Sequence, residues 1–250
     1  VSGSVFYCLS ISVMAGSKRI AFLLQHFGGG GLQRVVLNLL TELAHYDLEL
    51  DLVLANAQGF FLDQLPKSVR VVNLDVAIAS RTKDSPKLLP PLIQYLRQEQ
   101  PNVLLSNLVF INAIAVLARR LSGVACQLIL VEHLPLLNAD APDLPQSRLL
   151  QFFRRTLYPD ADAIVSVTGA MAQQMRDDLN LDPSLVQVIE NPVIAPSLLD
   201  HAAEFCDHPW FQPNQPPVFL AAGRLMPQKD FFTLIRAFAL VQQQRSARLM

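Results

Sequence analysis

Charged side chains are scarce in this sequence of 250 residues. Asp, Glu, Lys and Arg make up 16% of it and hydrophobic residues 51%, whereas about 25% of an average soluble protein is charged. Disordered chains combine low hydrophobicity with high charge, so this composition excludes disorder. Twenty basic residues against 21 acidic ones leave a formal net charge of −1. Proteins that bind nucleic acid usually have an excess of basic residues, so nucleic acid is not an expected partner of this chain.

Cysteine is also rare. The three thiols, Cys8, Cys126 and Cys206, are far apart and form no CxxC pair. This argues against a disulfide framework and against a structural zinc site. Free thiols in a reducing compartment are the simplest interpretation, and they favour a cytoplasmic location.

No segment has the composition of a signal peptide or a membrane span. Residues 1–17 are uncharged, but Lys18 and Arg19 follow this stretch, whereas a signal peptide has its positive charge in front. Five serines interrupt the stretch, and a span needs about 20 predominantly apolar residues. We interpret residues 1–17 as an upstream extension outside the fold, with Met14 as the natural start. A weak membrane anchor is the alternative.

Apolar strands alternate with amphipathic helices from Lys18 to about residue 190. Several strands, such as 127–131 and 163–167, are apolar throughout, which is typical of parallel strands covered on both faces. Residues 32–44 have apolar side chains at helical spacing. The predicted fold class is α/β with a doubly wound, Rossmann-like parallel sheet.

Between Asn191 and Pro217, a proline-rich segment interrupts the alternation of strands and helices. A new strand is expected at 218–223 and a new helix at 231–244, but one such unit cannot form a stable sheet alone. We therefore expect a first domain at 18–195, a hinge at 196–217, and the incomplete start of a second Rossmann-like domain at 218–250.

Four consecutive glycines, Gly28 to Gly31, separate the first expected strand from the first expected helix. Glycine permits close approach of a ligand, and the unpaired N–H groups of a helix N-terminus attract phosphate. A flexible turn is the simpler alternative. The run matches neither the P-loop nor the GxGxxG pattern. Asn56 stands where an NAD-binding strand would end in an acidic residue, so an NAD-type enzyme is disfavoured.

Arg224 and Lys229 lie between the expected strand at 218–223 and the helix that begins near Asp230. Ligands of α/β proteins bind at this end of the strands, and the two cations together suit a diphosphate. A solvated surface pair is the alternative.

Glu132 and His133 close the strand at 128–131 and must point to opposite faces of it. His133 is a candidate catalytic residue, although a packed, hydrogen-bonded histidine explains it more simply. Thr168 is interpreted as a helix N-cap, and Glu190 to Pro192 as a turn.

Five segments together, in this order, resemble glycosyltransferase family 4 of the GT-B fold. The segment with GR and QKD, after an NPV hinge, is the most specific of them. The segments are KRIAFLLQHFGGGGLQRVVLNLLTELA, LILVEH, ADAIVSVTGAMAQQM, VQVIENPV and VFLAAGRLMPQKDFFTLIRAFA.

This resemblance implies transfer of a sugar, with retention, from a UDP- or GDP-linked donor to a glycan or a lipid-linked acceptor. Neither a cofactor nor a bound metal is implied. Gly30 and Gly31 would contact the donor phosphate, Gln33 and His133 the acceptor, and Arg224 and Lys229 the leaving diphosphate. The family often has Gly-Gly-Ala-Glu where this chain has Leu32 and Gln33, which weakens the acceptor inference.

The family's donor domain also carries two glutamates separated by seven residues, and the sequence ends before that region. We therefore expect a truncated chain with weak activity or none. The alternative is a non-enzymatic nucleotide- or glycan-binding remnant that pairs with another chain. Peripheral membrane contact is a further expectation, since Arg148, Arg154 and Arg155 lie near Phe152 and Phe153. A partly buried helix with a solvated basic face explains these residues more simply.

Overall fold

Two compact units make up the chain in its computed structural model, residues 1–193 and 194–250. The structure describes residues 18–79, 84–133, 145–193 and 196–250. Residues 1–17, interpreted above as an extension, lie outside the described residues.

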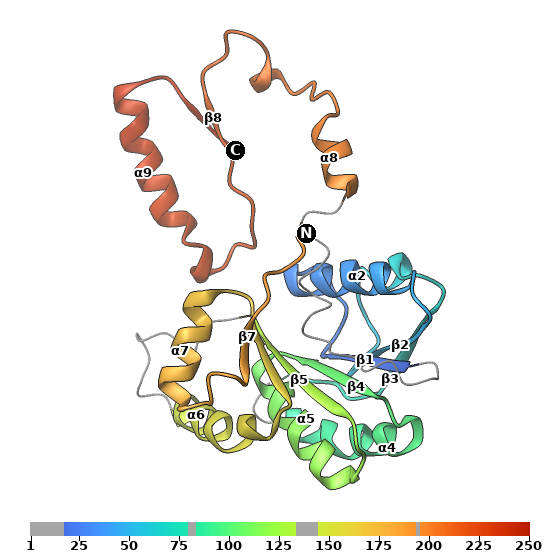
Figure 1. Ribbon diagram of the computed structural model, residues 1–250. Coiled ribbons are helices and arrows are strands. Elements are labelled where there is room, and N and C mark those ends of the chain that lie inside the picture. Colours follow the sequence, from blue (N-terminus) through green and yellow to red (C-terminus); the bar gives the residue numbers. More distant parts are fainter. Residues whose placement is uncertain (1–17, 80–83, 134–144, 194–195) are drawn as a thin grey trace. The chain divides into compact units, whose positions relative to one another are not determined.

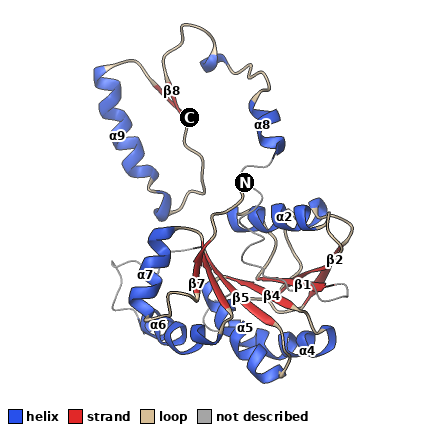
Figure 2. Cartoon of the chain, viewed as in Figure 1, coloured by secondary structure: helices blue, strands red, loops and turns tan. Residues whose placement is uncertain are grey.

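A seven-stranded sheet forms the centre of the first unit (Figures 1 and 2). Every pairing in it is parallel, and the strand order is β3-β2-β1-β4-β5-β6-β7. This confirms the predicted doubly wound parallel sheet. The strands are β1 (Lys18–Leu24), β2 (Leu48–Leu54), β3 (Val69–Asn73), β4 (Val103–Asn107), β5 (Gln127–Glu132), β6 (Ala163–Ser166) and β7 (Val186–Val188).

Helices cover both faces of this sheet, as its apolar strands require. Figure 1 shows α2 on one face and α4, α5 and α6 on the other, and the packing of Met175 and Leu179 places α7 with the second group. Short 3₁₀ turns η1 (Leu62–Gln64), η2 (Ser85–Leu88) and η3 (Tyr158–Asp160) connect these elements. The helices are α2 (Gly31–Leu43), α4 (Leu89–Glu99), α5 (Val109–Ser122), α6 (Pro145–Leu157) and α7 (Gly169–Leu179).

Local sequence signals set several helix boundaries. Pro90 and Pro91 lie in the first turn of α4, where proline removes no intrahelical hydrogen bond. The Thr168 hydroxyl accepts a hydrogen bond from the Met171 N–H at 3.3 Å, which confirms the predicted N-cap of α7.

A buried carboxylate, Asp51 in the middle of β2, joins neighbouring elements. Asp51 is 2% exposed. Arg70 of β3 binds it with two hydrogen bonds, of 2.8 and 2.6 Å, and the Tyr95 hydroxyl of α4 donates a third, of 2.7 Å. Burial and the adjacent Asp51 charge raise the pKa of Tyr95. The charge of Asp51 is thus compensated, as burial in an apolar strand requires.

The second unit contains one β-α-β segment and a proline-rich stretch before it. Strands β8 (Val218–Phe219) and β9 (Arg248–Leu249) pair in parallel, so the expected strand at 218–223 is shorter than predicted. In helix α9 (Phe231–Gln244), Phe238 packs edge-on against Phe219 with ring centroids 5.8 Å apart, whereas Ile235 is 57% exposed. No residue of α9 is buried. The remaining elements are α8 (Pro196–Ala202), η4 (Pro209–Phe211) and η5 (Pro227–Lys229).

Candidate functional site

The topology places a crevice where β1 and β4 lie side by side. From this point the chain winds outward in both directions, and ligands of such sheets bind beyond the carboxyl ends of the strands. The glycine run follows β1, and Asn107 ends β4. His133 follows β5, the next strand.

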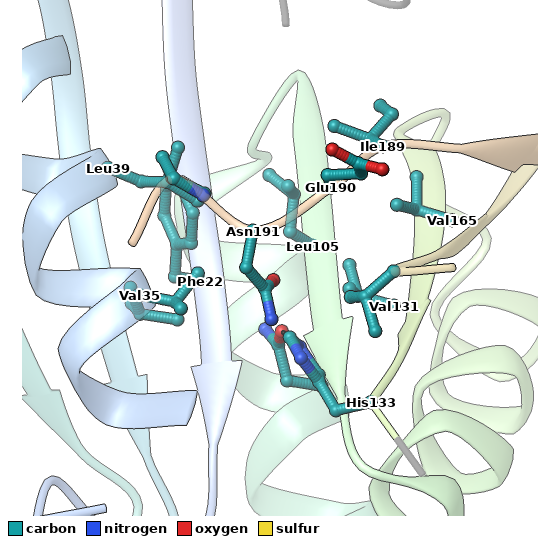
Figure 3. A pocket seen from close by; sticks show the side chains of 14 residues that line it. Phe22, Val35, Leu39, Leu105, Val131, His133, Val165, Ile189, Glu190 and Asn191 are labelled. Atoms are coloured by element: carbon teal, nitrogen blue, oxygen red, sulfur yellow. Dashed lines mark hydrogen bonds between the residues drawn. The ribbon is translucent and has the colours of Figure 1, made fainter. Parts of the chain in front are cut away.

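A small apolar pocket opens beside this crevice, on the face of the sheet that α2 covers (Figure 3). Its volume is about 90 Å³. Residues two apart on four successive strands line it, because side chains at that spacing share one face. These residues lie near or just after the ends of β4, β5, β6 and β7 and are Leu105, Asn107, Val131, His133, Val165, Val167, Ile189 and Asn191. In addition, β1 contributes Phe22, and α2 contributes Val35, Val36 and Leu39.

Polar groups gather at one end of the pocket. The His133 Nε2 atom lies 3.2 Å from the Asn107 side-chain oxygen. Asn107 is 3% exposed, and its Nδ2 group has no hydrogen-bond partner among the described residues. In Figure 3 the side-chain amide of Asn191 points toward His133.

His133 is uncharged at neutral pH, since burial lowers its pKa to about 4. An amide oxygen only accepts hydrogen bonds, so the proton of the neutral ring lies on Nε2 and points to Asn107. The Nδ1 atom is then a hydrogen-bond acceptor. The pocket therefore presents an amide donor and an imidazole acceptor within apolar walls.

Glu132 points to the opposite face, as the alternation along a strand requires. It is buried against Arg154, whose Nη2 lies 3.3 Å from its carboxylate, and it accepts hydrogen bonds from Tyr158 and Asn112. Burial raises the pKa of Glu132, and the Arg154 charge opposes that shift. This cluster ties α5 and α6 to the end of β5, next to His133.

The prediction that α6 has a solvent-exposed basic face is wrong for one of its three arginines. Arg154 is 1% exposed and paired with Glu132, so it does not reach the surface. Arg155 donates two hydrogen bonds to the Asp178 carbonyl at the end of α7. Phe153 is partly buried and packs against the core, whereas Phe152 is 60% exposed. The Arg148 side chain lies outside the described residues.

The glycine run begins as a hydrogen-bonded turn. The Gly28 N–H donates to His26 Nδ1 at 3.1 Å, and the Gly30 N–H donates to the Gly28 carbonyl at 3.0 Å. Of the two predicted phosphate ligands, Gly31 alone therefore offers its N–H in this conformation. Gln33 is buried, with its side-chain oxygen against Gly30.

The loop after β2 forms hydrogen bonds with the residue that precedes this turn. The Phe27 N–H donates to the Gln58 carbonyl at 2.9 Å, and the Phe27 carbonyl accepts from the Phe61 N–H at 3.2 Å. Gly59 lies between these contacts with φ of 149°, and a Cβ there would meet the Phe27 carbonyl at 2.0 Å. Only glycine fits this position without displacing the start of the glycine run.

Arg224 and Lys229 are exposed cations in the segment between β8 and α9 of the second unit. Methylene groups of Lys229 lie 3.5–3.6 Å from where a Cβ of Gly223 would stand, so the lysine packs beside the backbone that carries Arg224. Neither cation has an ion-pair partner within the described ranges. Asp230 then caps α9 through a 3.2 Å hydrogen bond from the Thr233 N–H.

A family model settles the relationship of the chain to known proteins. The model described as "Glycosyl transferase 4-like domain" matches residues 30–192, from the glycine run to the turn after β7. The chain belongs to this glycosyltransferase family. None of the curated proteins matches the sequence significantly.

Solved structures share the fold of this glycosyltransferase chain. Sucrose-phosphate synthase from Thermosynechococcus elongatus superposes with a TM-score of 0.68 at 15% identity, over 93% of this chain and 61% of its own. HepE from Anabaena in complex with UDP and glucose gives 0.62 at 18% identity, over 92% and 60%. UDP-N-acetylglucosamine 2-epimerase from Rickettsia bellii gives 0.60 at 12% identity, over 94% and 62%. The chain thus spans about three fifths of each of these structures.

The family match covers most of the predicted site residues of this glycosyltransferase domain. Gly30, Gly31, Gln33 and His133 all lie within it. His133 lines the pocket, whereas Gln33 packs on the glycine run. Arg224 and Lys229 belong to the second unit.

Sequence reasoning missed two residues of the pocket. Asn107 ends an apolar strand as His133 does, so its position at a carboxyl end was a usable signal. Asn191 was interpreted only as part of a turn. That turn exists, with the Val193 N–H donating to the Asn191 carbonyl at 2.9 Å, and it presents the Asn191 side chain to the pocket.

None of the described helices has the length and apolarity needed to cross a membrane. The described residues also contain no cluster of three His, Cys, Asp or Glu side chains arranged as metal ligands.

Proposed function

We propose that this chain forms the acceptor-binding domain and the beginning of the donor domain of a retaining glycosyltransferase. Its substrates are a UDP- or GDP-linked sugar and a glycan or lipid-linked acceptor. In the reaction the bond from the anomeric carbon to the diphosphate breaks, a bond to the acceptor oxygen forms, and the acceptor hydroxyl loses its proton.

The observation that carries this proposal is the pair of unpartnered cations in the second unit. Arg224 precedes η5 and Lys229 ends it, just before α9, and neither forms an ion pair with a carboxylate of the described residues. Negative charge grows on the diphosphate as it leaves, and preorganised cations stabilise that charge more in the transition state than in the ground state. In the first unit, the Gly31 N–H and the α2 N-terminus are a separate candidate for binding phosphate.

The proposal is tested by calorimetric titration of the chain with UDP and with GDP. We expect one nucleotide to bind, and Arg224→Ala or Lys229→Ala to weaken binding by about tenfold or more, the scale of a lost charge-assisted contact. Arg236→Ala removes an exposed cation of the same unit from α9 and should leave binding unchanged. Equal weakening by all three variants, or no binding of either nucleotide, would contradict the diphosphate assignment.

Turnover provides the second measurement. In a form that catalyses transfer, Arg224→Ala or Lys229→Ala should lower kcat by about a hundredfold or more, as loss of a preorganised transition-state contact does. We also propose that transfer needs donor-domain residues that the longer relatives have and this sequence does not contain. The 250-residue chain should then bind nucleotide with little turnover.

Cytoplasmic location and peripheral membrane contact remain part of the proposal. Phe152 is an exposed apolar residue of α6 and supports membrane contact, whereas Arg154 is buried and does not. Co-sedimentation with anionic vesicles tests it, and Phe152→Ser should reduce binding if α6 is the contact.

A further inference from the structure

The polar end of the pocket contains a buried hydrogen-bond donor without a partner among the described residues. The Asn107 Nδ2 group is buried and has no partner among the described residues, although its oxygen is bonded to His133. Buried donors are almost always satisfied, because an unpaired one loses its hydration without compensation. Asn107 is one of the residues that line the pocket, so a ligand that enters lies next to this unpaired donor.

The size of the pocket limits what enters. Its volume is about 90 Å³, whereas an engineered cavity known to bind benzene has a volume of about 150 Å³. A whole sugar ring does not fit, but a substituent of a few non-hydrogen atoms does. The ring itself would then lie at the mouth of the pocket.

The chemistry of the walls narrows the choice further. Side chains of Phe22, Val131 and Val165 favour a methyl group. Asn107 Nδ2 requires an acceptor oxygen, and His133 Nδ1 or the Asn191 amide takes an N–H. A methyl, a carbonyl and an N–H in one small group make an acetamido substituent.

Other small substituents fit less well. A hydroxymethyl group gains little from the apolar walls, and a methyl group alone leaves Asn107 unpaired. A carboxylate or phosphate would meet no positive charge, because His133 is neutral and Glu190 is the charged residue among those that line the pocket.

We propose that this pocket is a specificity subsite for the acetamido group of a 2-acetamido sugar in the acceptor. The proposal rests on the function proposed above, since it assigns a class of acceptor to the same domain. It assigns Asn107 as the donor to the acetyl carbonyl, and Val131 as part of the wall around the methyl group.

Ligand-observed NMR with two probes tests the subsite. Methyl N-acetyl-β-glucosaminide and methyl β-glucoside differ only at the second carbon, where one carries acetamido and the other hydroxyl. We expect the acetamido sugar to bind about tenfold more tightly, with the strongest saturation transfer to its acetyl methyl protons. Equal binding of the two probes, or no binding of either, overturns the proposal.

Three variants test whether the preference for the acetamido sugar arises in this pocket. Asn107→Asp replaces the donor with an oxygen of the same shape and should remove most of the preference. Val131→Phe fills the pocket and should do the same. Val188→Phe, at an exposed position on β7 that points away from the pocket, is the matched control and should retain the preference. Circular dichroism of each variant separates lost binding from lost folding, and a folded Val131→Phe that keeps the full preference overturns the assignment.

Failure of this subsite and failure of the proposed function give different results. Nucleotide titration depends on Arg224 and Lys229 in the second unit, whereas the acetamido preference depends on Asn107 and Val131 in the first. Nucleotide binding without a sugar preference removes the subsite alone. A sugar preference without nucleotide binding removes the transferase proposal and leaves a sugar-binding domain.

Discussion

His133 shows how much a single residue depends on the face of the strand it occupies. Its neighbour Glu132 is enclosed by helices and bonded to the Arg154 guanidinium, while His133 lies in an apolar pocket with an amide as its partner. One position along the strand therefore separates an ion pair from a neutral imidazole.

The lowered pKa of His133 predicts a specific loss of stability in acid. Its pKa is about 4 in the folded chain and about 6.5 in an unfolded one. Between these values the unfolded state binds more protons, so the free energy of unfolding falls as the pH drops from about 6.5 to 4. Above pH 6.5 the residue is neutral in both states and contributes no pH dependence.

Urea denaturation at pH 7 and pH 4.5 measures this loss. Wild type should lose about 2 kcal/mol more than His133→Gln between the two pH values, since each unit of pKa difference is worth about 1.4 kcal/mol. The variant keeps every carboxylate of the chain, including Glu190 of the pocket, and therefore controls for their contribution. Equal losses would mean that the ring is solvated.

At the scale of elements, the loop after β2 holds the start of the glycine run in place through backbone hydrogen bonds. Phe27 exchanges hydrogen bonds with both ends of the turn from Gln58 to Phe61, and its ring packs edge-on against Phe61 at 6.1 Å. The start of the candidate phosphate loop is thus held by an element that contains none of the predicted ligands.

Gly59→Ala tests this support. The added Cβ overlaps the Phe27 carbonyl, and the φ of 149° disfavours any side chain, so we expect a loss of about 2–4 kcal/mol in the free energy of unfolding. Gly123→Ala is the control. It places alanine at φ of 71° at the end of α5 with open space around it, and should cost only about 1 kcal/mol.

Chemical shifts of the Gly28 to Gly31 amides should move in Gly59→Ala and stay in place in Gly123→Ala. Similar costs for the two variants, with unmoved glycine amides, would show that the loop after β2 does not position the glycine run.

At the scale of the whole molecule, the two units differ in how much they bury. Strands β1 and β4 run through the core of the first unit, whereas α9 has no buried residue. Local stability follows buried apolar contact, so the units should open with very different free energies.

Hydrogen exchange by NMR or mass spectrometry checks this contrast. Amides of α9 should exchange at least about a hundredfold faster than those of β1 and β4, a difference of about 3 kcal/mol or more in opening free energy. Slow exchange in α9, comparable to that of β4, would show that its apolar side is covered in solution.

The order of strands and helices, the Thr168 cap and the proline start of α4 were all readable from the sequence. Each depends on residues a few positions apart, because hydrophobic periodicity, capping and proline geometry are local. The family resemblance was readable for a similar reason, since it rests on short motifs in a fixed order, and the match over residues 30–192 confirms it.

Tertiary structure alone decided which side chains meet. Arg154 looked like a surface charge beside Phe152, but its partner Glu132 lies 22 positions earlier on another element. Asn107 contacts His133, which is 26 positions away in the sequence. Gly59 lies against the backbone of Phe27, which belongs to the segment after β1. The alternation of β-α units by itself determined a parallel doubly wound sheet for this chain. Its pocket, its buried ion pair and its supported glycine run come from contacts between distant residues, which local periodicity does not encode.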